Sequence, residues 1–329
     1  MKRTAKVLIY LFLILFILVG VGMSYVKFGL PNVGEAPELK VELTPQRIER
    51  GKYLANNVTL CIDCHSQRDW SKFTAPPVAG TIGMGGEKFD ESIGFPGSVH
   101  SANITPFNLK GWSDGELYRL ITTGVTQDGS ALINIMPYPA YGKMATEDIY
   151  SIIAYIRTLP SKESQLPERR LDFPLNFIVN TIPAEASPQS IPSESDTLRY
   201  GGYLVNAAAC IECHTKHDKG SPVAGMEFAG GREFSGPGGS VFSSNITSDI
   251  ATGIGGWTKE QFIARFKQYG KGYEPHEVKP GEFQTIMPWM MYAQMTDSDL
   301  SAIYTYIHSL KPIKNQVTRF VPQKLIAKN

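Results

Sequence analysis

The pentapeptide Cys61-Ile62-Asp63-Cys64-His65 returns later in this chain as Cys210-Ile211-Glu212-Cys213-His214. Cys-x-x-Cys-His is the attachment signature of a c-type haem, in which both thiols bond to the porphyrin and the histidine binds the iron. On a helical turn these three side chains share one face, because positions i, i+3 and i+4 are neighbours. The sequence therefore predicts two covalently bound haem c groups, attached through Cys61, Cys64, Cys210 and Cys213, with His65 and His214 as axial ligands.

Two other chemistries use paired cysteines, a structural zinc site and a redox dithiol. A zinc site does not require a histidine directly after each pair, and a thioredoxin-like motif needs a βαβ context that we do not find in this sequence. The chain has four cysteines in all, so haem attachment would use every one of them. The repeated motif therefore favours haem over both alternatives.

The second axial ligand of each iron is predicted from two further dipeptides, Met136-Pro137 and Met287-Pro288, which follow the two histidines at similar distances. The proline biases the methionine before it towards an extended conformation, which suits a loop that offers its thioether to iron. A core position is the commoner role of methionine. We expect that role for the methionines without a methionine in the matching place of the other repeat, which are Met84, Met290 and Met291.

The chain carries an internal repeat that extends well beyond the two motifs. Tyr-Leu precedes both motifs, and the segments Pro-Val-Ala-Gly, Asn-Ile-Thr and Gly-Trp return in the same order, beginning at residues 77, 103 and 111 in the first copy and at 222, 245 and 256 in the second. Trp112 with Arg119, and Trp257 with Arg265, either hold haem propionates or have ordinary structural roles.

Local signals predict where the helices begin. Thr44 and Pro45 are typical of an N-cap and a first helical position. Capping boxes start a helix at Ser113, which ends at Gly124, and another at Thr258. Apolar residues at helical spacing predict a last helix in each copy, over residues 146–159 and 296–310.

The segment from Val7 to Val26 is apolar apart from one serine. Twenty residues span about 30 Å as a helix, the thickness of the hydrocarbon core of a bilayer. A cleaved signal peptide is the alternative, but the segment is long for one and has a poor cleavage site. We therefore expect an uncleaved anchor whose basic N-terminus stays in the cytoplasm. The rest of the chain is slightly acidic, which argues against a nucleic-acid-binding surface.

The sequence resembles a known family, the multihaem cytochrome c subunits of membrane-bound alcohol, gluconate and aldehyde dehydrogenases of bacterial respiratory chains. The resemblance rests on segments of both copies and covers most of the chain beyond the anchor. Members of that family usually carry three haems, whereas the motifs here provide two. The segments are Ser101-Ala102-Asn103-Ile104-Thr105, Gly111-Trp112-Ser113-Asp114, Thr123-Gly124-Val125, Met136-Pro137-Tyr138, Tyr155-Ile156-Arg157-Thr158-Leu159-Pro160, Ser244-Asn245-Ile246-Thr247 and Thr252-Gly253-Ile254-Gly255-Gly256-Trp257.

The expected fold is all-α, with two tandem class I cytochrome c domains preceded by a transmembrane helix, because neither copy shows the period-two pattern of strands. Within the linker between the copies, only Leu171 to Ile178 is apolar enough to pack on another surface. The expected order is a transmembrane anchor at 1–28, a tether at 29–44, a first cytochrome c domain at 45–160, a Pro-rich linker at 161–197, a second cytochrome c domain at 198–315 and a C-terminal tail at 316–329.

The resemblance implies an electron-transfer protein of the respiratory chain and not an enzyme. It would lie on the periplasmic side of the inner membrane, between a dehydrogenase or quinol-oxidising complex and an oxidase or soluble cytochrome. The rival hypothesis is a di-haem enzyme, a peroxidase or a thiosulfate-oxidising cytochrome. A peroxidase needs an iron with an open position, and the thiosulfate-oxidising family uses a cysteine ligand, which this chain does not have to spare.

Overall fold

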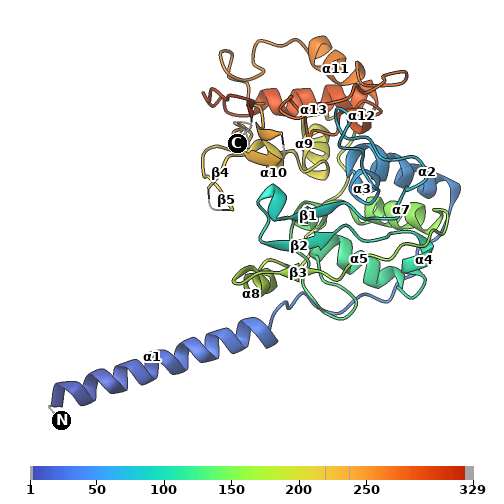
Figure 1. Ribbon diagram of the computed structural model, residues 1–329. Coiled ribbons are helices and arrows are strands. Elements are labelled where there is room, and N and C mark those ends of the chain that lie inside the picture. Colours follow the sequence, from blue (N-terminus) through green and yellow to red (C-terminus); the bar gives the residue numbers. More distant parts are fainter. Residues whose placement is uncertain (1–2, 219, 237, 323–329) are drawn as a thin grey trace, which may run out of the picture.

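A long N-terminal helix stands apart from the rest of the molecule (Figure 1). The computed structural model describes residues 3–218, 220–236 and 238–322. Helix α1 (Arg3–Phe28) has no buried residue. It is long and apolar enough to cross a membrane, with a mean hydropathy of 2.8 over its best window, a test that a signal sequence would also pass. Length and composition therefore make it a candidate anchor.

The first half of the chain is built around two crossing helices, α2 and α7. Thr44 caps α2 as predicted, since its hydroxyl accepts a hydrogen bond from the Arg47 N–H, 3.3 Å away. In chain order the elements are α2 (Pro45–Tyr53), the π-helical turn η1 (Leu54–Val58), α3 (Cys61–Cys64), β1 (Lys88–Asp90), the 3-10 turn η2 (Glu91–Ile93), β2 (Gly97–His100), α4 (Pro106–Leu109), α5 (Asp114–Thr123), α6 (Tyr138–Tyr141) and α7 (Thr146–Arg157).

The second half repeats this plan, with α9 crossing α13 as α2 crosses α7. The predicted capping box of Thr258 and Gln261 starts α11, and Thr296 caps the final helix. After the connecting elements β3 (Arg170–Leu171), α8 (Leu175–Ile178) and the 3-10 turn η3 (Val179–Thr181), the chain continues through α9 (Thr197–Ala207), α10 (Cys210–His214), β4 (His217–Asp218), β5 (Ser221–Pro222), β6 (Glu233–Gly236), β7 (Gly239–Phe242), α11 (Lys259–Lys267), α12 (Trp289–Tyr292), α13 (Asp297–Ser309) and β8 (Phe320–Pro322).

The close approach of each helix pair depends on a glycine. A Cβ atom at Gly51 of α2 would lie 1.7 Å from the carbonyl oxygen of Ser151 in α7. The matching Gly201 of α9 would place a Cβ 1.9 Å from the carbonyl oxygen of Ala302 in α13. Since these contacts are with backbone atoms, a side chain at either position would force the helices apart.

The described residues also form three small antiparallel sheets, so the prediction of an all-α fold is wrong. In the first half the order is β1-β2-β3, with Phe89 opposite Val99 and Gly97 opposite Leu171. The second half contains the two-stranded sheet β4-β5 and a sheet in the order β6-β7-β8. These strands are two to four residues long. Such short segments leave no run in which apolar and polar residues alternate, which is why the pattern was missed.

The third strand of each larger sheet comes from beyond the last helix of its own half. Strand β3 lies in the predicted linker, and β8 lies in the predicted tail. The side-chain amide of Asn103 donates to the Lys162 carbonyl at 2.8 Å, and Asn245 donates to Ile313 in the same way. The segment that follows the last helix of each half therefore packs against that same half. The domain boundaries themselves stay predictions.

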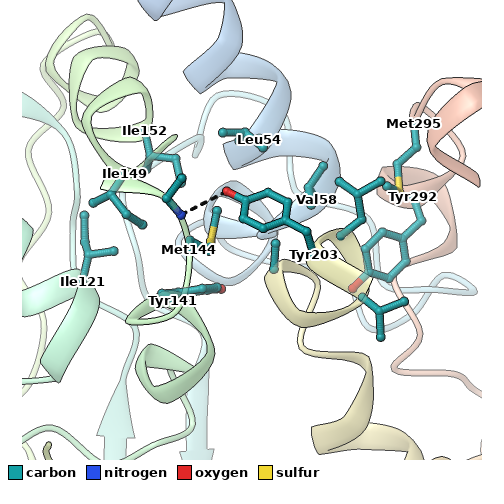
Figure 2. Packing of buried hydrophobic residues seen from close by; sticks show 14 of the residues in the cluster. Leu54, Val58, Ile121, Tyr141, Met144, Ile149, Ile152, Tyr203, Tyr292 and Met295 are labelled. Carbon is teal, nitrogen blue, oxygen red and sulfur yellow. Dashed lines mark hydrogen bonds between the residues drawn. The ribbon is translucent and has the colours of Figure 1, made fainter. Parts of the chain in front are cut away.

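The two halves share one hydrophobic core (Figure 2). Leu54, Met144 and Ile149 of the first half belong to the same buried cluster as Tyr203 and Met295 of the second. Met144 and Met295 occupy matching positions, two residues before the first residues of α7 and α13. The halves are therefore packed together and are not two separate bodies joined by a linker.

Two reciprocal hydrogen bonds cross between the halves. Tyr203, which precedes the second motif, donates to the Asp148 carboxylate of α7 at 2.6 Å. Tyr53, which precedes the first motif, donates in the same way to Asp299 of α13. Burial and the Asp148 charge raise the pKa of Tyr203, so its hydroxyl stays protonated and donates. Asp148 also receives both arms of the Arg50 guanidinium, each at 2.9 Å. This buried network fixes the orientation of one half against the other.

Candidate haem sites

Each Cys-x-x-Cys-His motif lies on a short helical turn that begins after a residue with left-handed backbone. Leu60 has φ 56° before the turn of Cys61, and Ala209 has φ 49° before the turn of Cys210. A positive φ is uncommon for residues with a side chain. Its recurrence at matched positions shows that both halves reverse the chain in the same way to present the motif.

Both motif histidines are fixed by a backbone carbonyl. Nδ1 of His65 lies 2.7 Å from the Ala102 oxygen, and Nδ1 of His214 lies 2.8 Å from the Ser244 oxygen. A carbonyl can only accept, so Nδ1 carries the proton and Nε2 is left with its lone pair. Burial lowers the pKa of both imidazoles, which keeps them neutral. A neutral ring held through Nδ1 is the form that binds iron through Nε2.

The repeated Asn-Ile-Thr segments explain how those carbonyls are held. The Asn103 side-chain oxygen accepts from the N–H and the hydroxyl of Thr105, at 2.8 and 2.7 Å. Asn245 and Thr247 form the same turn at 2.9 and 2.8 Å. Each asparagine directly follows the residue whose carbonyl holds the histidine. The repeated segment therefore supports the carbonyl that binds the motif histidine, a role that sequence reasoning missed.

The four thiols do not have the surroundings of a zinc site or a reactive dithiol. Burial raises the pKa of Cys64 and Cys210 to about 12. A reactive thiol needs the opposite shift. In the part of the chain that the structure describes, no three histidine, cysteine or acidic side chains are gathered as metal ligands. The donor set fits thioether attachment of a haem, which needs the two sulfurs and one imidazole of each motif.

Two tyrosines hold the methionine loops beside the motifs. The Tyr141 hydroxyl donates to the Thr59 carbonyl at 2.6 Å, and that of Tyr292 donates to the Ala208 carbonyl at 3.0 Å. Both follow their Met-Pro dipeptide at the same interval, and both acceptors lie two residues before the first cysteine of a motif. Burial and the neighbouring cysteines raise the pKa of both tyrosines, in accordance with this position.

Met136 and Met287 themselves are partly buried and pack against the shared core. Each backbone carbonyl accepts from the N–H two residues on, at 2.8 Å in both halves. The two methionines therefore occupy equivalent loops, next to the tyrosines that tie those loops to the motifs. Their axial role stays a prediction.

The repeated arginines have different surroundings in the two halves. Arg119 donates to the Thr126 carbonyl at 2.7 Å, while its Nε is buried without a hydrogen-bond partner among the described residues. Arg265 instead lies over the Trp289 ring, 4.7 Å from its centroid. The unpaired Nε–H of Arg119 could donate to a carboxylate such as a haem propionate. Arg265 has no such buried free donor among the described residues, so only Arg119 remains a candidate for binding a propionate.

The electrostatic surroundings of the two motifs also differ. Near Cys64, the buried Asp63 lies 3.5 Å from Arg68, and the buried Glu87 accepts a hydrogen bond from Trp70 at 2.7 Å. The residue matching Glu87 is Arg232, which donates to a backbone carbonyl within the second motif. Two carboxylates, of Asp63 and Glu87, therefore lie near the Arg68 guanidinium at the first motif. At the second motif, the Arg232 guanidinium takes the place of the Glu87 carboxylate.

These features match the donor set of c-type cytochromes, in which haem is held covalently. A family model described as cytochrome c matches residues 199–311. It matches one stretch, so the prediction of two tandem class I cytochrome c domains is wrong in that form. The first half departs from the second at the approach to its motif, which runs through a π-helical turn, whereas α9 remains α-helical to Ala207.

Curated relatives confirm the resemblance to cytochrome c subunits of dehydrogenases. The chain is 25% identical over 284 residues to the cytochrome c subunit of a quinone-dependent alcohol dehydrogenase from Gluconacetobacter polyoxogenes, covering 81% of this chain and 56% of that protein. It is 28% identical over 275 residues to the fructose dehydrogenase cytochrome subunit of Gluconobacter japonicus, with coverages of 80% and 52%. For the gluconate 2-dehydrogenase cytochrome c subunit of Pantoea cypripedii the values are 25% over 298 residues, 85% and 63%. The chain thus spans little more than half the length of these relatives.

Proposed function

We propose that this protein is a di-haem c-type cytochrome that transfers single electrons in a respiratory chain. The observation that carries the proposal is the matched orientation of His65 and His214, each with Nδ1 bound to a backbone carbonyl and Nε2 free for iron. In both halves this arrangement occurs at the histidine that directly follows a cysteine pair, and the carbonyl comes from a matching, distant segment. The cytochrome c subunits that resemble this chain support the same class of function.

The residues of each half have separate tasks in this proposal. A bound haem supplies one-electron exchange between ferric and ferrous iron. The cysteines would attach it, and the motif histidine would hold the iron together with Met136 in the first half or Met287 in the second. Tyr141 and Tyr292 hold the methionine loops at the motifs. With a histidine and a methionine bound to each iron, no position would be left for a substrate, and this proposed ligation favours a carrier over a peroxidase.

The proposed location is the outer face of the cytoplasmic membrane, with α1 as the anchor. A dehydrogenase or quinol-oxidising complex would be the electron donor, and an oxidase or soluble cytochrome the acceptor. The names of the relatives support a dehydrogenase partner, since they are subunits of alcohol, fructose and gluconate dehydrogenases. Tethering to the membrane would raise the effective concentration of the protein near such partners.

The haem content tests the proposal directly. Purified protein should contain two haems per chain by the pyridine haemochrome assay, and both should stay with the polypeptide in acidified organic solvent because thioether bonds are covalent. Replacing Cys210 and Cys213 with serine should leave one. A content of one haem in the unaltered protein, or zinc in its place, would contradict the assignment of two sites.

The methionine ligands are tested by spectroscopy. Oxidised protein should show the weak near-infrared band of sulfur-to-iron charge transfer, and Met136→Leu and Met287→Leu should each remove about half of it, because two equivalent haems contribute. Met290→Leu is the matched control and should leave the band unchanged. Persistence of the full band in both single variants would show that the ligands lie elsewhere.

The anchor is tested by fractionation. The protein should stay with membranes after washing with high salt and at alkaline pH, because about 20 apolar residues are held by the bilayer core and not by charge. Protease added from the periplasmic side should digest the haem-bearing part, whereas protease on the cytoplasmic side should not. A mature soluble protein that begins after residue 28 would identify α1 as a cleaved signal.

A further inference from the structure

The connection between the two halves places apolar side chains on the surface beside the end of α1. Phe173, just before the turn α8, is 78% exposed, and Ile178, the last residue of that turn, is 46% exposed. The final residue of α1, Phe28, is 80% exposed. Both α8 and η3 contact α1, and Figure 1 shows α8 next to the C-terminal end of that helix. From Phe173 to Ala184 the chain has no charged residue.

The exposed side chains belong to a segment that is held in place. Strand β3, just before it, pairs with β2, and the Asp172 N–H donates to the Pro96 carbonyl at 3.2 Å. Val179, directly after Ile178, is buried. Phe173 and Ile178 are therefore presented outwards by a fixed backbone.

We propose that this surface, formed by Phe173, Ile178 and the end of α1, rests in the interfacial layer of the lipid bilayer. The inference rests on the proposed anchoring role of α1. A helix of 26 residues is about 39 Å long, which exceeds a hydrocarbon core of about 30 Å. Its last turn, with Tyr25 and Lys27, therefore reaches the headgroup layer, where aromatic and basic residues are favoured. Since α8 contacts α1, its exposed apolar side chains come to the same depth.

The lipid surface fits this patch better than a partner protein does. A single helical turn is too short to bind a membrane alone, but the neighbouring anchor supplies the attachment and removes most of the entropic cost. The patch would then act as a second contact that sets the tilt of the first half. This would keep that half, and not the second, next to the bilayer.

The experiment uses the full chain reconstituted into phospholipid vesicles whose acyl chains carry a photoactivatable diazirine. After irradiation, peptides are mapped by mass spectrometry. Label is expected in α1 and in the peptide containing residues 173–182. The control is Ile250, which is 81% exposed and lies in the second half; its peptide should carry only background label. Phe173→Ser with Ile178→Ser should reduce the label in residues 173–182 at least about tenfold without changing that in α1, whereas Ile250→Ser should change neither.

The labelling pattern distinguishes failure of the second membrane contact from failure of the α1 anchor. Label in α1 but only background label in residues 173–182 would overturn the second contact and leave the anchor intact. Absence of label from both segments would overturn the anchor and the inference together. In native membranes, cross-linking of residues 173–182 to another protein in place of lipid would also overturn it, by assigning the patch to a protein partner.

Discussion

Cells that lack this protein should keep the dye-linked activity of the dehydrogenase proposed as its electron donor, while losing oxygen uptake on the substrate of that dehydrogenase. The reason is that an artificial dye accepts electrons before the cytochrome, whereas oxygen is reached only through it. Dye reduction and oxygen consumption are measured on the same membranes. The expected effect is complete loss of the second activity, since electrons then have no route past the missing haems.

Complementation provides the control for this prediction. The unaltered chain and the surface variant Ile250→Ser should restore oxygen uptake, while a chain with Cys61 and Cys64 replaced by serine should not. The rival hypothesis of a di-haem enzyme makes the opposite claim. Rapid turnover of peroxide or of a sulfur oxyanion by the purified protein would refute the proposed carrier function.

Replacing Asp148 with alanine should lower the free energy of unfolding by about 3–5 kcal/mol, because the change leaves a partly buried guanidinium without its partner. The Asp148 side chain is 2% exposed and binds Arg50 through both oxygens. It also accepts the bond from Tyr203 that joins the two halves. Denaturant unfolding, followed at the same time by far-ultraviolet circular dichroism and by the Soret band, measures the effect.

The adjacent glutamate is a matched control. Glu147 pairs with Arg47 at 2.5 Å, but its side chain is 65% exposed. Solvent screening limits such pairs, so Glu147→Ala should cost no more than about 1 kcal/mol. Both variants should unfold in one transition, because the core is shared. Two separate transitions, with the second half unaffected by Asp148→Ala, would show that the halves do not depend on each other.

Features decided by neighbouring residues could be predicted from the sequence. The capping boxes at Ser113 and Thr258 start helices because their hydrogen bonds close within three residues. The cysteine motifs likewise depend on a single helical turn. The prediction of a last helix in each half was correct to within two residues.

Features that depend on distant residues could not be predicted in this way. The carbonyls of Ala102 and Ser244 lie 37 and 30 residues from the histidines that they fix. Tyr53 and Asp299 are 246 residues apart in the chain. Strand β3 pairs with β2, from which it is separated in the chain by four helices. No local pattern marks these contacts, although the repeat placed Tyr53 and Tyr203 at matching positions.

The segment between the halves limits domain swapping between copies of this chain. Backbone N–H groups of Ser187 and Gln189 donate to the carbonyls of Gly142 and Lys143, so the connection stays on the first half to residue 189. Helix α9 begins at Thr197, and only residues 190–196 are left as a free tether. A tether this short keeps the second half at a high effective concentration near its own partner surface. When the interface opens, reclosure within one molecule therefore outcompetes domain swapping between two.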